Sequence, residues 1–236
     1  MVSSAPSLRD LVRGTLDEAI SAAEAHSPGT VTVLDAGCGH DSPLRPFRPR
    51  IARLVGADIA HPGEPPAYLD QFVAADLCAP DEPFPPATFD LILMNFALEH
   101  MADPPVAFGH LRRALRPGGR LVATTVNRRH PFIAAYLALP DAFRAPLQRL
   151  VKVSPADAHP LVGACNDPAT VRRMLEDAGF VDNRLRTVDH LRQAWGRRRL
   201  TALVGRLGDA LVGGRADRRS TIVAVGSAPA TGGPGG

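Results

Sequence analysis

Short apolar runs recur along the first half of this 236-residue chain, and helical or loop segments separate them. Each run is almost continuously apolar, which is typical of strands buried on both faces of a parallel sheet. Strands that alternate with helices at this spacing predict an α/β fold with a doubly wound sheet. The runs interpreted as the first five strands are Val31–Asp35, Ala52–Asp58, Gln71–Asp76, Phe89–Asn95 and Arg120–Val126.

Helix signals fill the spaces between these strands and continue after them. Apolar residues at helical spacing, or capping residues followed by helix-ending glycines, predict helices over Ser7–Ala25, from Asp103 to Pro117-Gly118-Gly119, around Pro140–Val151, and from Asp167 to Gly179. Ser7 and Asp10 resemble a capping box. Two further strands are expected over Asn183–His190 and Ser220–Ala228.

The composition fits a globular protein, with 45% hydrophobic and 22% charged residues. The three cysteines form no even framework and lack metal-ligand spacing, which predicts free thiols and no metal site. No apolar run approaches the roughly 18 residues of a membrane span, and the first residues mix acids with bases, so we expect a cytoplasmic protein. The net charge of +3 is mild and mostly arginine, and we expect no nucleic-acid partner.

The loop after the first strand, in VTVLDAGCGHDSPL, resembles a nucleotide-binding loop but departs from the dinucleotide pattern. Gly37 and Gly39 let the backbone approach a ligand without side-chain obstruction. The third glycine of the dinucleotide pattern is replaced by Ser42. Ligands of parallel sheets bind beyond the carboxyl ends of the strands, so this loop is a candidate binding site.

Four predicted strands end in a polar residue: Asp35, Asp58, Asp76 and Asn95. Asp58 lies about 20 residues after the loop, where a carboxylate accepts hydrogen bonds from ribose hydroxyls. Asp76 is placed to accept a hydrogen bond from the amine of an adenine. Asp35 would repel a pyrophosphate and attract an ammonium or sulfonium group, so it distinguishes between nucleotide classes.

The ordered motifs resemble those of class I S-adenosylmethionine-dependent methyltransferases of the small-molecule group, close to methyltransferase type 11. The matching stretches are VLDAGCG, VGADIA, AADLCAP, FPPATFDLILMNFALEHM, LRRALRPGGRLVATTVN and VRRMLEDAGF. The resemblance is close over Val31–Val126 and looser over Asp167–Phe180. It implies a Rossmann-like seven-stranded sheet whose last strand is antiparallel, a role that suits Ser220–Ala228.

The resemblance also implies a binding role for S-adenosyl-L-methionine at nine positions. The loop glycines would line the methionine half, the acid ending the second strand would hold the ribose, and the residues after the third and fourth strands would contact the adenine and the sulfonium end. These positions are Asp35, Gly37, Gly39, Asp58, Ile59, Asp76, Leu77, Asn95 and Phe96. Asp41 stands where the family usually has a third glycine.

Methyl transfer is an in-line displacement, so an enzyme of this class mainly positions two reactants and excludes water. A general base is needed only where the acceptor must lose a proton. His100 is a candidate for this role, although a structural position at a helix start is favoured; His130 and His159 are further candidates. We expect a small organic acceptor, methylated at oxygen.

Two alternatives remain open. A nicotinamide-dependent oxidoreductase would use the same sheet, but it expects the missing third glycine and no acid at Asp35. A catalytically inactive protein that binds the cofactor and regulates a partner would carry the same motifs. Cofactor binding without methyl transfer distinguishes this second alternative.

We expect the chain to divide into an N-terminal helical segment (1–30), a domain that resembles the methyltransferases (31–226) and a disordered tail (227–236). Residues 127–165 and 190–215 are expected to be variable insertions that build a lid over a hydrophobic or lipid-like acceptor. Within 195–213, leucines recur at helical spacing beside arginines. Such a basic amphipathic helix either packs on the domain, which we favour, or contacts a membrane surface.

Overall fold

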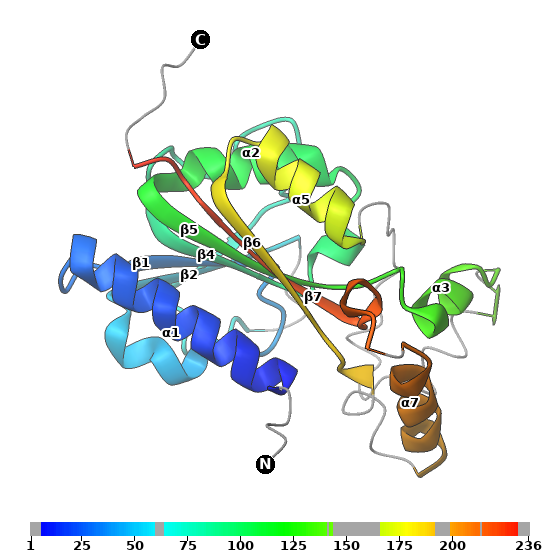
Figure 1. The fold of residues 1–236 in the computed structure, drawn as a ribbon. Helices are drawn as coiled ribbons and strands as arrows, with labels where there is room; N and C mark the ends of the chain where they lie inside the picture. The colour runs from blue at the N-terminus through cyan, green and yellow to red at the C-terminus, as the bar shows by residue number, and fades with distance from the viewer. Residues whose placement is uncertain are drawn as a thin grey trace.

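The computed structural model describes residues 6–59, 64–140, 142–143, 166–191, 199–212 and 214–230. Its centre is a seven-stranded sheet of order β3-β2-β1-β4-β5-β7-β6 (Figure 1). The strands are β1 (Thr32–Ala36), β2 (Arg53–Asp58), β3 (Gln71–Ala74), β4 (Phe89–Asn95), β5 (Leu115–Val126), β6 (Val181–Val188) and β7 (Thr221–Ser227). β1 to β5 pair in parallel, whereas β7 runs antiparallel between β5 and β6. The predicted doubly wound sheet with an antiparallel last strand is confirmed.

The helices begin where the capping residues indicate. Described helices are α1 (Leu8–His26), α2 (Pro104–Ala114), α3 (Pro131–Leu137), α5 (Pro168–Asp177) and α7 (Arg199–Val212), with short 3-10 turns η1 (Arg45–Arg50), η2 (Leu98–His100) and η4 (Ala216–Arg218). Ser7, Asp103 and Asp167 each accept hydrogen bonds from backbone N–H groups of the first turns of α1, α2 and α5. The predicted starts of these helices are therefore confirmed.

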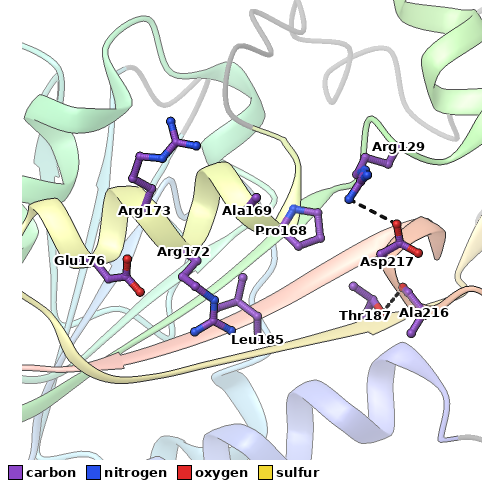
Figure 2. A pocket seen from close by; sticks show the side chains of 10 residues that line it. All are labelled: Arg129, Pro168, Ala169, Arg172, Arg173, Glu176, Leu185, Thr187, Ala216 and Asp217. Atoms are coloured by element: carbon purple, nitrogen blue, oxygen red, sulfur yellow. Dashed lines mark hydrogen bonds and ion pairs between the residues drawn. The ribbon is translucent and has the colours of Figure 1, made fainter.

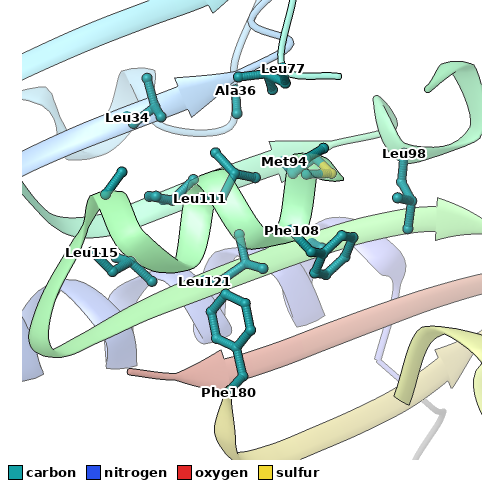
Figure 3. Packing of buried hydrophobic residues seen from close by; sticks show 14 of the residues in the cluster. Leu34, Ala36, Leu77, Met94, Leu98, Phe108, Leu111, Leu115, Leu121 and Phe180 are labelled. Carbon is teal, nitrogen blue, oxygen red and sulfur yellow. The ribbon is translucent and has the colours of Figure 1, made fainter. Parts of the chain in front are cut away.

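The sheet is covered on both faces, and each face has its own apolar core. On one face α1 buries Leu16 and Ile20 against strand residues that include Leu54. On the other face α2 and α5 pack, and Figure 3 shows Phe108 of α2 and Phe180 within this apolar cluster. The rings of Phe108 and Phe180 meet edge to face at 6.3 Å. This double cover explains why the strands are continuously apolar.

β5 begins earlier than the sequence predicts. Leu115 already pairs with Phe89, and the register then shifts before Arg120 pairs with Leu91. Gly118 has φ +77°, so the Pro-Gly-Gly stretch forms an irregularity within β5 rather than the loop before it. The preceding helix accordingly ends at Ala114.

Several sequence-based expectations concern residues outside the described ranges. His159, most of the expected helix around 140–151, the first part of 195–213 and the tail from 231 are among them. β7 extends to Ser227, and the buried Ala228 donates its N–H to the Gly119 carbonyl at 2.8 Å. Cys38 and Cys78 are free thiols. Within the described ranges, the helices are too short or too polar to cross a membrane.

Candidate functional site

The glycine loop after β1 folds against the end of β2. The N–H groups of Gly37 and Cys38 both donate to the Ala57 carbonyl, at 2.7 and 3.1 Å. Gly37 and Gly39 have φ of +74° and +49°, in the left-handed region that favours glycine. A Cβ at Gly37 would overlap the Cβ of Ala97, which follows β4. The loop backbone therefore joins the ends of three neighbouring strands.

The carboxylate of Asp58, the last residue of β2, is fixed by the backbone around it. One oxygen accepts from Gly39 N–H at 3.1 Å, and the other accepts from Ile59 N–H at 2.8 Å. Ile59 itself is 71% exposed, which is high for a large apolar side chain. The fixed carboxylate of Asp58 thus lies between the glycine loop and the exposed side chain of Ile59.

Asp35 lies behind this loop and is fully buried, with one carboxyl oxygen that has no hydrogen-bond partner. Burial raises the pKa of Asp35 to about 7; a hydrogen bond from Ser42 opposes this, and the negative charges of Asp58 and Asp41 add to it. The exposed Asp41 side chain pairs instead with Arg45 at 3.2 Å. A buried acid therefore lies under the loop, and within the described ranges no cationic side chain neutralises it.

Asn95 and Phe96 are held at the end of β4 by Thr124 of β5. The Thr124 hydroxyl donates to Asn95 Oδ1 at 2.7 Å, and the Thr124 carbonyl accepts from Phe96 N–H at 3.1 Å. Phe96 has φ +52°, a strained conformation for a bulky residue and one that is common at ligand sites. Its ring stacks on His190, with centroids 6.4 Å apart.

Sequence reasoning missed His190, although a signal was present. β6 runs parallel to β5, so its carboxyl end lies at the same edge as the other strand ends. His190 follows that end by two residues. Applied to the sixth strand, the strand-end argument would have found it.

Asp76 and Leu77 follow β3, which is the next strand along after β2. Asp76 is exposed, and its carboxylate accepts from Cys78 N–H at 2.8 Å in a tight turn. The Leu77 carbonyl lies 3.1 Å from Nδ1 of the buried His110. Eight of the nine residues predicted to bind the cofactor end or follow one of four adjacent strands, β3, β2, β1 and β4, and the ninth, Asp35, is the penultimate residue of β1, so all nine lie at one edge of the sheet.

The candidate bases occupy different environments. His100 ends η2, where its N–H donates to the Ala97 carbonyl at 3.0 Å, so it belongs to the turn after β4. His130 is fully buried, and its Nδ1 accepts from Phe132 N–H at 3.2 Å as the cap of α3. Burial lowers the pKa of His130. His130 is therefore placed as a neutral helix cap.

Glu99 was also missed from the sequence. It is buried and accepts a hydrogen bond from the Thr125 hydroxyl at 2.8 Å, so it ties η2 to the end of β5. The described ranges contain no cluster of three or more His, Cys, Asp or Glu side chains suited to a metal ion.

A surface pocket of about 460 Å³ lies outside this edge, between α5, β6 and η4 (Figure 2). Arg129 and Asp217 pair across one end of it at 3.2 Å, and Arg172 of α5 lines its side. None of the nine predicted cofactor residues lines it. This pocket is therefore separate from the candidate site.

Comparison with known proteins gives a consistent result. Residues 8–185 match a family described as "Methyltransferase domain". The chain is 30% identical over 105 residues to the ubiquinone/menaquinone biosynthesis C-methyltransferase of Cellvibrio japonicus, covering 42% of each chain. It is 32% identical over 117 residues to the ubiquinone biosynthesis O-methyltransferase of Idiomarina loihiensis, covering 44% of this chain and 47% of that one. The matches thus span less than half of the length of these two relatives.

The fold is also similar to solved structures. A structure titled as an S-adenosylmethionine-dependent methyltransferase from Archaeoglobus fulgidus superposes with a TM-score of 0.56 at 16% identity, covering 93% of this chain and 94% of that one. At this identity the likeness establishes a shared fold.

Proposed function

We propose, since this chain belongs to the methyltransferase-domain family, that it transfers the methyl group of S-adenosylmethionine to a small organic acceptor. The observation that carries the proposal is the edge shared by β3, β2, β1 and β4. There, a glycine loop lies between a buried acid and a carboxylate fixed by backbone N–H groups.

Three features fit this cofactor. Asp58 is preorganised to accept hydrogen bonds from ribose hydroxyls, because its two backbone contacts fix its orientation. The exposed Ile59 next to it offers an apolar surface to an adenine ring. Burial raises the pKa of Asp35 to about 7, and a nearby ammonium or sulfonium group would favour the ionised form of this carboxyl, whose second oxygen has no hydrogen-bond partner.

The same charges argue against the oxidoreductase alternative. A dinucleotide would bring its pyrophosphate to the loop above Asp35, and repulsion from the ionised form of this carboxyl group would weaken its binding. Position 42, where that class has a glycine, is a buried serine whose hydroxyl accepts from Leu44 N–H at 3.2 Å. We therefore propose a cationic nucleoside as the ligand.

S-adenosylmethionine, when bound, supplies an electrophilic methyl group on a positively charged sulfur. The chain must then orient the acceptor in line with this group and exclude water. Asn95 and Phe96 are suited to this role, because Thr124 fixes both at the end of β4. The stacked rings of Phe96 and His190 provide a flat surface beside the reaction site.

We propose that the acceptor is hydrophobic and that oxygen is the methylated atom. One named relative is a C-methyltransferase and another an O-methyltransferase of quinone biosynthesis, so the relationship favours a quinone-like acceptor without choosing the atom. An oxygen acceptor must lose a proton. His100, in the turn after β4, is the candidate to take it.

The test is transfer of an isotopically labelled methyl group from S-adenosylmethionine to a panel of hydrophobic phenols and hydroquinones. We expect a labelled methyl ether and an equal amount of S-adenosylhomocysteine. Asp58→Ala should abolish transfer, whereas Asp41→Ala is the matched control, because Asp41 is exposed and its carboxylate pairs with the exposed Arg45.

Two results would contradict the proposal. Cofactor binding without transfer to any acceptor would favour the inactive regulatory alternative. Label appearing on a ring carbon would keep the activity but refute oxygen as the methylated atom.

A further inference from the structure

One face of α7 carries a stripe of exposed leucines. Leu203, Leu207 and Leu211 are four residues apart, so they lie on the same face of the helix. Their exposed fractions are 53%, 54% and 66%. Soluble proteins usually bury a continuous apolar stripe of this kind, and an exposed one marks an interaction surface.

The opposite face of α7 is already packed, which fixes the direction of the stripe. Gly208 lies so close to α3 that a Cβ there would come within 2.6 Å of the Phe132 ring. Val212 is only 2% exposed. In Figure 1, α7 and α3 stand side by side away from the central sheet. The leucines are therefore held outward by packing on their far side.

Exposed apolar residues are concentrated in this part of the molecule. Phe143, which follows α3, is 66% exposed. Of the six large apolar residues that are exposed within the described ranges, four belong to α7 or to the chain just after α3; they are Phe143, Leu203, Leu207 and Leu211. The other two lie at separate places, Ile59 at the candidate cofactor site and Val181 at the start of β6.

Positive charge accompanies the stripe. Arg206 of α7 and Arg215, just beyond its end, are both exposed. The sequence from 192 to 215 contains six arginines and one aspartate, so this stretch is strongly positive. The same stretch contains the one tryptophan of the chain, Trp195, four residues before α7 begins.

We propose that α7 docks this protein on a membrane surface that contains anionic lipids. An amphipathic helix with leucines on one face and arginines beside them lies in the lipid interface, where the leucines enter the acyl region and the arginines contact headgroups. The positive charge of residues 192–215 favours an anionic lipid surface over a neutral apolar partner. The inference rests on α7 and holds whichever acceptor the proposed enzyme uses.

The test uses the full chain with vesicles of phosphatidylcholine alone, or of phosphatidylcholine mixed with phosphatidylglycerol. We expect co-sedimentation with the mixed vesicles, a blue shift of the Trp195 emission, and loss of both at high salt. Leu207→Gln should weaken partitioning about tenfold, because a leucine leaves the lipid. Arg206→Gln should weaken it about fivefold.

Val181→Gln is the matched control, because Val181 is an exposed apolar residue on β6, and its partitioning should equal that of the parent. Unchanged melting temperatures would show that the exposed substitutions leave the fold intact. The proposal is wrong if the chain does not bind the mixed vesicles, if it binds both kinds of vesicle equally, or if Leu207→Gln leaves the binding unchanged. A dimer in light scattering that Leu207→Gln dissociates, without vesicle binding, would assign the stripe to a second copy of the chain.

Discussion

Gly37→Ala tests how tightly the glycine loop is held against the end of β4. An alanine at φ +74° costs about 1 kcal/mol in backbone strain. Its Cβ would also overlap the Cβ of Ala97, and overpacking of this kind costs about 2 kcal/mol. The expected loss is therefore about 3 kcal/mol in the free energy of unfolding, or about 10 °C in melting temperature for a chain of this size.

A double-mutant cycle separates the two contributions. Ala97→Gly alone should lower the free energy of unfolding by about 1 kcal/mol. Combined with Gly37→Ala it should remove the overlap, so the loss in the double variant should be about 2 kcal/mol smaller than the sum of the two single losses. Gly39→Ala is the control for backbone strain, because no atom lies within 4 Å of its added Cβ. Denaturant unfolding measures the parent and the four variants. Strictly additive losses at 37 and 97 would refute the close contact.

Three further predictions concern single acids. The pKa of Asp35 in the folded chain is about 7, above its usual value, so the stability it contributes is present below about pH 4 and is lost as pH rises through 7. Asp35→Asn should flatten this fall, of up to about 4 kcal/mol, in unfolding measured against pH; an unchanged profile would contradict the assignment. Asp90→Ala should lower the free energy of unfolding in urea by about 3 kcal/mol, because the buried carboxylate accepts from the Ser27 hydroxyl, the Thr32 N–H and the Arg116 guanidinium. A loss below about 1 kcal/mol would contradict this. Asp167→Ala should lower the melting temperature through loss of the α5 cap, about 1 kcal/mol, whereas the exposed Asp177→Ala should have no such effect.

The sequence predicts the sheet well, because buried parallel strands and capped helices leave local signals. The runs ending in Asp58 and Asn95 became β2 and β4, and the helix expected after Asp167 became α5. Because parallel strands have their carboxyl ends at the same edge of a sheet, the polar residues at those ends could be placed together from the sequence. The start of β5 was the exception, because Pro-Gly-Gly usually ends an element, and only pairing with β4 shows that the strand already runs there.

Contacts between distant residues could not be predicted from one sequence. Thr124 holds Asn95 because the register of β4 and β5 places them opposite each other. The stacking of Phe96 on His190 and the bond between Glu99 and Thr125 likewise depend on how separate strand ends converge. A single sequence specifies the polarity of a strand, but register and side-chain direction are settled by packing.

The most direct test of the proposed cofactor site is calorimetric titration of the chain with S-adenosylhomocysteine. The account predicts one site, no comparable binding of a nicotinamide dinucleotide, and a loss of about 100-fold in affinity for Asp58→Ala, which removes two charge-assisted hydrogen bonds to the ribose. Binding of the same strength by Asp58→Ala, or none by the parent chain at millimolar ligand, would contradict it.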